Sequence, residues 1–214
     1  MDKQSLKPII EKLENLFSKF NDKFYNGELQ QPIITVSPDM TKGAYGWCTG
    51  WKAWHIEAEQ ETDKKNSSDE GYYEINMCAE YLSRPFENIA ETLLHEMVHL
   101  YNLQIGVQDT SRGGTYHNKK YKESAEAHGL TVEKTKSGWN KTALNAEAKE
   151  FVDGLKDKKF KLFRERGFKL DAGKAASKQS TRKYVCPECG CIIRATKEVR
   201  VICGDCNVEF VEAE

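Results

Sequence analysis

Residues 86–104, FENIAETLLHEMVHLYNLQ, decide the fold because they form the longest apolar segment with helical periodicity. The preceding residues, Ser83-Arg84-Pro85, form a typical helix start, since proline is tolerated in the first turn. A helix that is apolar on most of its sides is a buried, central element. We therefore expect the domain to pack around this helix through Phe86, Ile89, Ala90, Leu93, Leu94, Met97, Val98 and Tyr101.

Two histidines and a glutamate interrupt this apolar helix as His95-Glu96-Met97-Val98-His99. Residues four apart lie one above the other on an α-helix, so both imidazoles can bind a single ion. Glu96 lies beside them, where its carboxylate can polarise a water molecule at that ion. Burying these polar groups without a function would cost free energy. The pattern therefore predicts a zinc site at His95 and His99 with Glu96 as the catalytic base.

A catalytic zinc ion usually has three protein ligands and one open position, so a third ligand is expected. The metzincin arrangement would need glycine at position 102 and histidine at position 105. This chain has Asn102 and Ile105 there, which excludes that class.

The third ligand can come from any of four candidate residues that follow this helix in the sequence. His117 or His128 would complete a three-histidine site, and Glu123 or Glu126 would complete a site with two histidines and one carboxylate. We favour His117 because it follows a glycine-rich loop directly and opens the next predicted helix, at 117–128. From there its side chain can fold back over the first helix.

The remaining elements indicate an α+β domain. An amphipathic helix is predicted at 5–25, ended by Asn26-Gly27, and the apolar periodicity after the zinc helix predicts another at 145–163. Residues 130–144 are ambiguous and favour an extended conformation. Strands are predicted at 33–36, 43–57 and 72–77, with a charged loop at 59–71.

The composition is that of a globular protein with one main core. The chain has 214 residues, 39% of them hydrophobic and 30% charged, and its mean hydropathy is −0.69. No stretch approaches the roughly 20 apolar residues of a membrane-spanning helix. The first residues also lack the apolar segment of a signal peptide, so we expect no membrane association and a cytoplasmic location.

The positive charge is concentrated in one segment. Residues 156–183 contain eleven basic and three acidic residues, a formal charge of +8, which leaves −9 for the rest of a chain whose total is −1. The total excludes an argument for nucleic-acid binding by the whole molecule, but the segment is typical of one that faces a polyanion. The alternative is a solvated tether. The candidate contacts are Lys169, Lys174, Lys178, Arg182, Lys183, Arg194, Lys197 and Arg200.

Five of the seven cysteines lie near the C-terminus. Cys186 and Cys189, with Cys203 and Cys206, form two CxxC pairs whose spacing predicts a four-thiolate structural zinc site. Residues 192–196 and 199–202 are predicted as the two strands between the pairs. A module this small needs the metal to fold. Cys191 is then a surplus thiol, and a redox function is disfavoured because no thioredoxin-like βαβ pattern surrounds the pairs.

These features together resemble the SprT-like family of zinc metallopeptidases, to which the Spartan proteases belong. The matching pieces are residues 24–29 (FYNGEL), 45–48 (YGWC), 75–76 (IN) and 91–99 (ETLLHEMVH), with His117 downstream. The resemblance covers roughly residues 5–130, and a C-terminal cysteine module also occurs in bacterial members. It implies zinc ligands at His95, His99 and His117, with Glu96 as general base. The chain departs from the family pattern in the acidic loop 59–71 and in the stretch between His99 and His117.

The sequence therefore predicts an α+β chain: a zincin-like helix–sheet–helix metallopeptidase domain at 1–163, a basic linker at 164–183 and a small β zinc ribbon at 184–214. Two zinc ions are expected, one catalytic and one structural. The predicted function is a zinc-dependent endopeptidase acting on protein substrates. The resemblance implies DNA-bound or DNA-crosslinked proteins among those substrates, with DNA contacted by the linker and ribbon. A non-catalytic, zinc-containing module that binds nucleic acid or protein is the alternative, and nothing in the sequence sets an oligomeric state.

Overall fold

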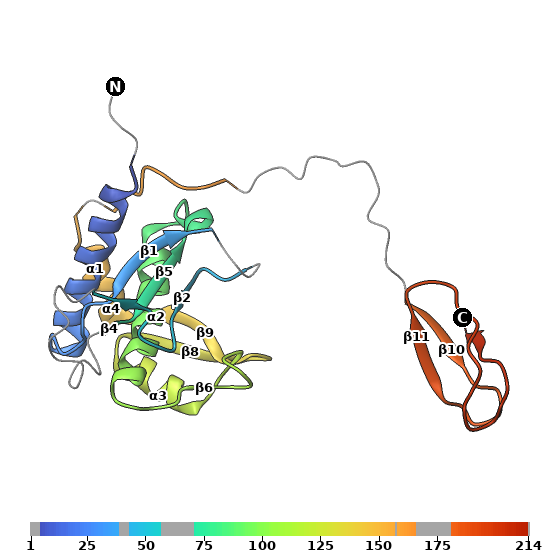
Figure 1. Ribbon diagram of the computed structural model, residues 1–214. Coiled ribbons are helices and arrows are strands. Elements are labelled where there is room, and N and C mark those ends of the chain that lie inside the picture. The colour runs from blue at the N-terminus through green and yellow to red at the C-terminus, as the bar shows by residue number, and fades with distance from the viewer. Residues whose placement is uncertain (1–4, 39–42, 57–70, 157, 166–180, 214) are drawn as a thin grey trace, which may run out of the picture. The chain divides into compact units, whose positions relative to one another are not determined.

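The computed structural model describes residues 5–38, 43–56, 71–156, 158–165 and 181–213. The chain divides into two compact units, residues 1–166 and 167–214, which are described one at a time. The predicted α+β class is confirmed, since helices and small sheets both contribute to the fold (Figure 1). Among the helices of the described residues, none combines the length and the apolar character needed to cross a bilayer.

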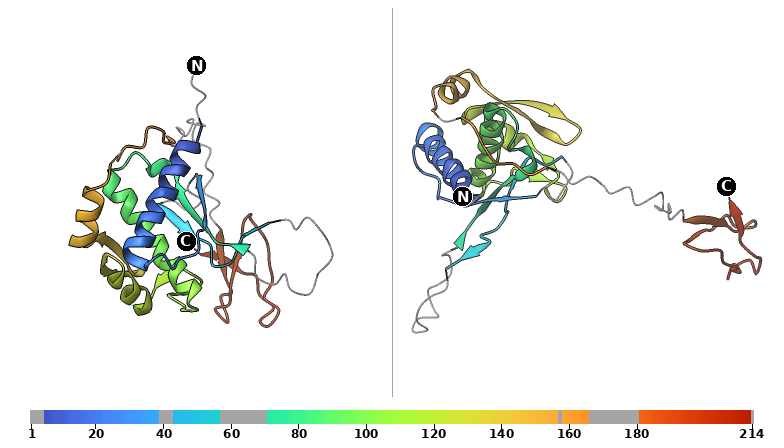
Figure 2. Two further views of the ribbon diagram at one scale, coloured as in Figure 1. Left: turned by 90° about the vertical axis from the view of Figure 1, so that its left-hand side faces the viewer. Right: turned by 90° about the horizontal axis from the view of Figure 1, so that it is seen from above.

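Helix α2 (Phe86–Gln104) is the central element of the larger unit. It begins directly after Pro85, which caps it from outside, and contacts the other three helices of the described residues as well as strands of two of the unit's three sheets. Figures 1 and 2 show it inside the unit with the other elements around it. Its buried residues are Ile89, Ala90, Thr92, Leu93, Leu94, Glu96, Met97, Val98, Leu100 and Asn102.

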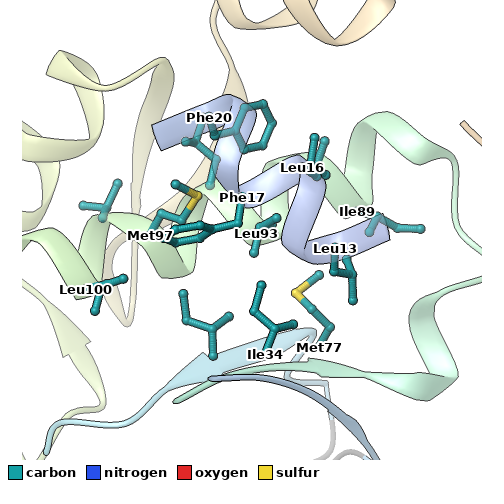
Figure 3. Packing of buried hydrophobic residues seen from close by; sticks show 14 of the residues in the cluster. Leu13, Leu16, Phe17, Phe20, Ile34, Met77, Ile89, Leu93, Met97 and Leu100 are labelled. Carbon is teal, nitrogen blue, oxygen red and sulfur yellow. The ribbon is translucent and has the colours of Figure 1, made fainter. Parts of the chain in front are cut away.

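Helix α1 (Lys7–Tyr25) covers α2 with one apolar face. Leu13, Phe17 and Phe20 on that face are completely buried. The helix ends where Asn26 adopts a left-handed conformation with φ of 54°, followed by Gly27 with φ of 74°. Figure 3 shows the side chains of α1 and α2 meeting Ile34 and Met77 from the sheet, so the core lies between these three layers.

The first sheet has the strand order β1-β5-β2. Strand β1 (Ile33–Ser37) is parallel to β5 (Glu74–Cys78), and β2 (Gly46–Cys48) is antiparallel to β5. A single 3₁₀ turn, η1 (Ala79–Tyr81), then leads toward α2.

The prediction of one continuous strand over 43–57 is wrong. The chain forms β2, bends at Gly50 and Trp51, and then forms β3 (Trp54–His55), which pairs with β4 (Gly71–Tyr72). Tyr45, Trp47 and Trp51 lie at alternate positions, as on one face of a strand, but Trp51 is 68% exposed because no core lies beneath it. Most of the charged loop predicted at 59–71 lies outside the described residues.

The second sheet has the order β6-β7-β9-β8 and closes the other side of α2. It consists of β6 (Thr110–Ser111), β7 (Tyr116–His117), β8 (Leu130–Thr135) and β9 (Gly138–Leu144). The ambiguous stretch 130–144 is thus an antiparallel hairpin, β8–β9.

Helices α3 (Lys119–Ala127) and α4 (Ala146–Asp153) are both shorter than predicted. The α3 helix begins only at Lys119 because the side chain of Asn118 caps it, accepting hydrogen bonds from two backbone N–H groups. The predicted helix over 145–163 stops before Gly154. Beyond Gly154, Leu155 and Phe160 still pack against the core, and the Phe160 ring stacks on Phe86, but these residues do so outside a helix.

The smaller unit is a three-stranded sheet with β10 (Arg182–Val185) between β11 (Ile192–Ala195) and β12 (Val211–Ala213). The prediction of a strand over 199–202 is wrong: only Ile202 makes a bridge, to Glu209. The turn in which the Cys186 N–H donates to the Cys191 carbonyl folds β11 back onto β10 instead. Among residues 181–213, the buried core consists of Tyr184, Cys186, Cys203 and Phe210.

Candidate active site

Helix α2 presents His95 and His99 on its side that faces the second sheet. Thr142 of β9 lies 3.1 Å from Nδ1 of His95, and Asp109 lies 2.7 Å from Nδ1 of His99. Each contact occupies the Nδ1 atom of its ring, so the Nε2 atoms of both rings remain available and project toward the same point.

His117 completes a group of three imidazoles. Its Nε2 lies 3.2 Å from Nε2 of His95 and 3.0 Å from Nε2 of His99. Nitrogen ligands on one tetrahedral zinc ion stand roughly 3.3 Å apart, given Zn–N bonds of about 2.0–2.1 Å. The three atoms therefore have the spacing of a metal site, and this group could hold a metal ion.

The backbone of His117 is held between two strands. It pairs with Thr110 of β6 on one side and with Gly138 of β9 on the other. A Cβ atom on Gly138 would lie 2.1 Å from the carbonyl oxygen of His117, and the φ of Gly138 is +88°. Only glycine permits this approach. His117 thus belongs to a strand and not to a helix start, which corrects the prediction.

Tyr121 forms the floor beneath the three histidines. Its ring centroid lies 4.9 Å from that of His95, 4.7 Å from that of His99 and 4.6 Å from that of His117. Tyr121 is completely buried and belongs to the first turn of α3. The cap at Asn118 therefore fixes both the start of the helix and the ring that supports the site.

A chain of polar side chains fixes His99. The Asp109 carboxylate accepts hydrogen bonds from Nδ1 of His99 and, at 3.0 Å, from the side-chain amide of Asn102. Ser124 donates to the other end of that amide at 2.7 Å. Hydrogen bonds of this kind set the tautomer and orientation of a metal-binding histidine. In the sequence Asp109 is only one of several polar loop residues, and no motif marks it.

The electrostatics keep two of the imidazoles neutral. Burial, together with the other two histidines, lowers the pKa of His95 well below its usual value. Burial and the neighbouring His99 likewise lower the pKa of His117 to about 4. Burial also opposes the charged form of His99, but Asp109 and Glu96 outweigh it, so that the pKa of His99 is raised. Neutral imidazoles offer the lone pairs that a metal ion requires.

Glu96 is buried beside this group. Burial raises the pKa of its carboxyl group to about 7, although a backbone hydrogen bond from Cys48 of β2 opposes the rise. Gly46 of β2 lets the strand pass close by, because a Cβ there would lie 2.8 Å from the Asn76 carbonyl oxygen and 3.4 Å from the side chain of Glu96. The same edge strand therefore holds and shields the carboxylate.

These groups open onto a cavity of about 750 Å³. Strand β2 and the segment before it form one wall, α2 supplies the floor with His95 and Glu96, and the β8–β9 hairpin forms the opposite wall. The lining residues are Gly43, Ala44, Tyr45, Gly46, Glu91, Thr92, His95, Glu96, Thr115, His117, Thr135, Ser137, Asn140, Lys141 and Thr142.

The other three candidate ligands lie elsewhere. His128 stacks on Tyr25, with ring centroids 4.3 Å apart, and its Nδ1 lies 2.6 Å from the Ser124 carbonyl oxygen. Glu123 and Glu126 are exposed on α3. The structure therefore brings His117, and none of these three, to His95 and His99.

The sequence model of the SprT-like family matches residues 13–142, more than half of the chain. The chain belongs to the SprT-like family. No curated protein and no solved structure matches it. The resemblance stated from the sequence is thus confirmed for the family, and membership suggests a metallopeptidase-type domain. The matched region contains the three histidines, Glu96 and Asp109, and it ends at Thr142 of β9.

In addition to the histidine group of the SprT-like domain, the smaller unit contains a second possible metal site. Cys186, Cys189, Cys203 and Cys206 form a group whose sulfur atoms all lie within 4.8 Å of one another. Two tight turns place them: the Gly190 N–H donates to the Cys186 carbonyl, and the Asn207 N–H donates to the Cys203 carbonyl. Cys191 is exposed and stays outside the group.

The residues predicted to contact nucleic acid differ in their surroundings in the structure. Lys169, Lys174 and Lys178 lie outside the described residues. Arg182 forms an ion pair with Glu212, and Arg200 forms one with Glu209. Lys183 and Arg194 are cross-strand partners on β10 and β11, and Lys197 is exposed in the turn that follows β11.

Proposed function

We propose that the SprT-like domain is a zinc-dependent endopeptidase that cleaves protein substrates. The observation that carries this proposal is the convergence of three imidazole Nε2 atoms beside a buried glutamate at the floor of a cavity. In this proposal His95, His99 and His117 hold the metal, and Glu96 is the catalytic base.

The donor set fits zinc. Three imidazole nitrogen donors with near-tetrahedral spacing suit Zn²⁺, whereas calcium and magnesium prefer oxygen ligands. The buried Nδ1 of His117 has no hydrogen-bond partner among the described residues, and the three Nε2 atoms face one another without a donor pattern that could satisfy all of them. A cation would resolve that arrangement. When bound, it would supply a Lewis acid that polarises a peptide carbonyl and acidifies water.

Glu96 would move the proton. Its carboxylate would accept a proton from the attacking water and return it to the leaving amine, the two transfers expected of a general base beside a bound metal ion. The Cys48 N–H holds the carboxylate in place while this occurs. Burial removes competing water from the base.

The cavity suits an extended polypeptide. Strand β2 is at the edge of the β1-β5-β2 sheet, and Gly46 of this strand lines the cavity. An edge strand offers backbone N–H and carbonyl groups to which an extended chain can add as a further strand. Binding of this kind contacts the substrate backbone and not its side chains. It is therefore compatible with a broad range of protein substrates.

Removing the metal should abolish cleavage. Dialysis of the full chain against a strong chelator should leave no measurable hydrolysis of unfolded casein, because the carbonyl is no longer polarised. One equivalent of Zn²⁺ beyond that taken up by the cysteines should restore it. The chain whose three histidines are replaced by alanine is the control and should stay inactive on zinc addition. Zinc at the histidines without any cleavage would favour the alternative, a non-catalytic binding module.

A second candidate function is nucleic-acid binding by the basic linker and ribbon, which would bring the domain to DNA-bound proteins. The observation that favours it is the pair Lys183 and Arg194, directly opposite one another on antiparallel strands. Like charges in this position destabilise a sheet unless an anion lies between them.

The test is the salt dependence of binding to single- and double-stranded DNA. The logarithm of the binding constant should fall linearly with the logarithm of salt concentration. Replacing both Lys183 and Arg194 with glutamine should make the slope shallower by about 1–2 units, because one or two phosphate contacts are lost. Replacing Lys7 and Lys19, exposed on α1, is the matched control. Binding that does not respond to salt would contradict this second function.

A further inference from the structure

Two residues outside the histidine–glutamate motif lie near His95: Thr142 on β9, which contacts its ring, and Glu91, which precedes it by one helical turn on α2. Because Glu91 and His95 are four residues apart, they lie on the same side of the helix. Thr142 lies against both. Its hydroxyl donates a hydrogen bond to the Glu91 carboxylate, and the same oxygen lies 3.1 Å from Nδ1 of His95.

A threonine hydroxyl has only one hydrogen. Since that hydrogen points to Glu91, the oxygen can only accept from His95. His95 must then carry its hydrogen on Nδ1, which leaves the lone pair of Nε2 facing His99 and His117. The carboxylate of Glu91 thus determines the tautomer of His95 without touching its ring.

We propose that Glu91 and Thr142 act together as positioning residues for His95, with Glu91 orienting the Thr142 hydroxyl and the hydroxyl fixing the ring. The inference rests on the metal site of the proposed function. In this arrangement the Glu91 carboxylate acts on His95 through the Thr142 hydroxyl, whereas the Asp109 carboxylate contacts His99 directly.

The surroundings support a role beyond packing. Glu91 and Thr142 both line the cavity of about 750 Å³, and both also line a smaller one of about 240 Å³ on their other side. A carboxylate between two cavities could turn toward solvent, but here it faces the hydroxyl. The guanidinium group of Arg84 attracts the Glu91 carboxylate and is itself held by Thr92, at 3.0 Å, and by the Tyr81 carbonyl.

Thr142 also links the site to one wall of the cavity. It lies on the β8–β9 hairpin, whose other residues line the opposite wall of the cavity. The relay therefore connects the wall of the substrate cavity to one of the three candidate ligands.

The test is the affinity of the full chain for metal at the histidines, measured by competition with a chromophoric chelator. Thr142→Val is nearly isosteric and suits a strand, so it should fold, but it should bind Zn²⁺ about 10–100-fold more weakly. Thr142→Ser keeps the hydroxyl and should bind close to wild type. Thr131→Val, an exposed threonine on β8, is the matched control and should not differ from wild type.

A double-mutant cycle distinguishes a relay from two separate effects. Glu91→Gln should weaken binding, but Glu91→Gln combined with Thr142→Val should bind no more weakly than Thr142→Val alone. Glu87→Gln, one turn earlier on α2, is the control for Glu91. Losses that multiply in the double variant, or a Thr142→Val chain that binds as wild type, would overturn the proposal.

Cobalt spectra distinguish a failure of the Glu91–Thr142 relay from a failure of the proposed metal site. The cysteine site gives thiolate charge-transfer absorption that should be identical in all variants, whereas the d–d bands of Co²⁺ at the histidines should change in Thr142→Val. If the wild type binds cobalt only through thiolates, the proposed metal site fails. If it binds at the histidines and every variant matches it, the relay alone is wrong.

Discussion

Glu96→Gln should lower peptide-bond cleavage by about 10²–10⁴-fold while metal at the histidines is retained. Glutamine has nearly the same shape and can still accept the hydrogen bond from the Cys48 N–H through its amide oxygen. It cannot take a proton from water. Because Glu96 is not among the three imidazoles that face one another, its replacement leaves the metal ligands intact.

The measurement is the initial rate of casein hydrolysis beside the zinc content of the same sample. Glu123→Gln is the matched control, since Glu123 is exposed on α3 and away from the three histidines. Its rate should equal that of the wild type. Equal rates for the wild type and Glu96→Gln would contradict the assignment of Glu96 as the base. A Glu96→Gln chain that has lost zinc would show that the residue holds the site together and does not only move the proton.

Cys203→Ser should unfold the smaller unit and leave the SprT-like domain folded. Cys203 is 4% exposed and is one of the four buried residues among 181–213. Structural zinc contributes apparent binding free energies of about 10–16 kcal/mol in zinc-finger peptides, which far exceeds what so small a core can supply. Serine is a poor substitute for a thiolate ligand, so the zinc and the fold should be lost together.

Two-dimensional amide NMR of the full chain measures this directly. The dispersed signals of residues 181–213 should collapse to random-coil positions, those of the larger unit should stay, and zinc should fall from two ions per chain to one. Cys191→Ser is the matched control because the Cys191 thiol is exposed and outside the group of four. Retention of two zinc ions and of the dispersed signals in Cys203→Ser would show that the four cysteines do not form the site.

The central helix was predictable because its signals are local. The apolar periodicity and the histidine spacing lie within the segment that forms α2, and Pro85, part of the predicted helix start, caps its first turn. The end of α1 at Asn26-Gly27 was predictable for the same reason, since the left-handed conformation there is a property of two adjacent residues.

The errors arise where the outcome depends on distant residues. The strand predicted at 43–57 breaks because no core lies under Trp51, and the hairpin predicted between the CxxC pairs fails because β10 competes for β11. In both cases the local pattern is compatible with a strand, but the available partner decides which residues pair.

The sequence by itself determined the family, the α+β class, the central helix with His95 and His99, and the two groups of residues with metal-binding chemistry, because short-range spacing and residue type express each of them. Only the tertiary structure decided which of four residues joins His95 and His99, and that Asp109, Thr142 and Glu91 surround them. Those contacts join residues 10 to 51 positions apart, and no periodicity connects such positions. His117 reaches the site because Gly138 lets β9 pass against its backbone, a close approach that exists only once the second sheet has formed.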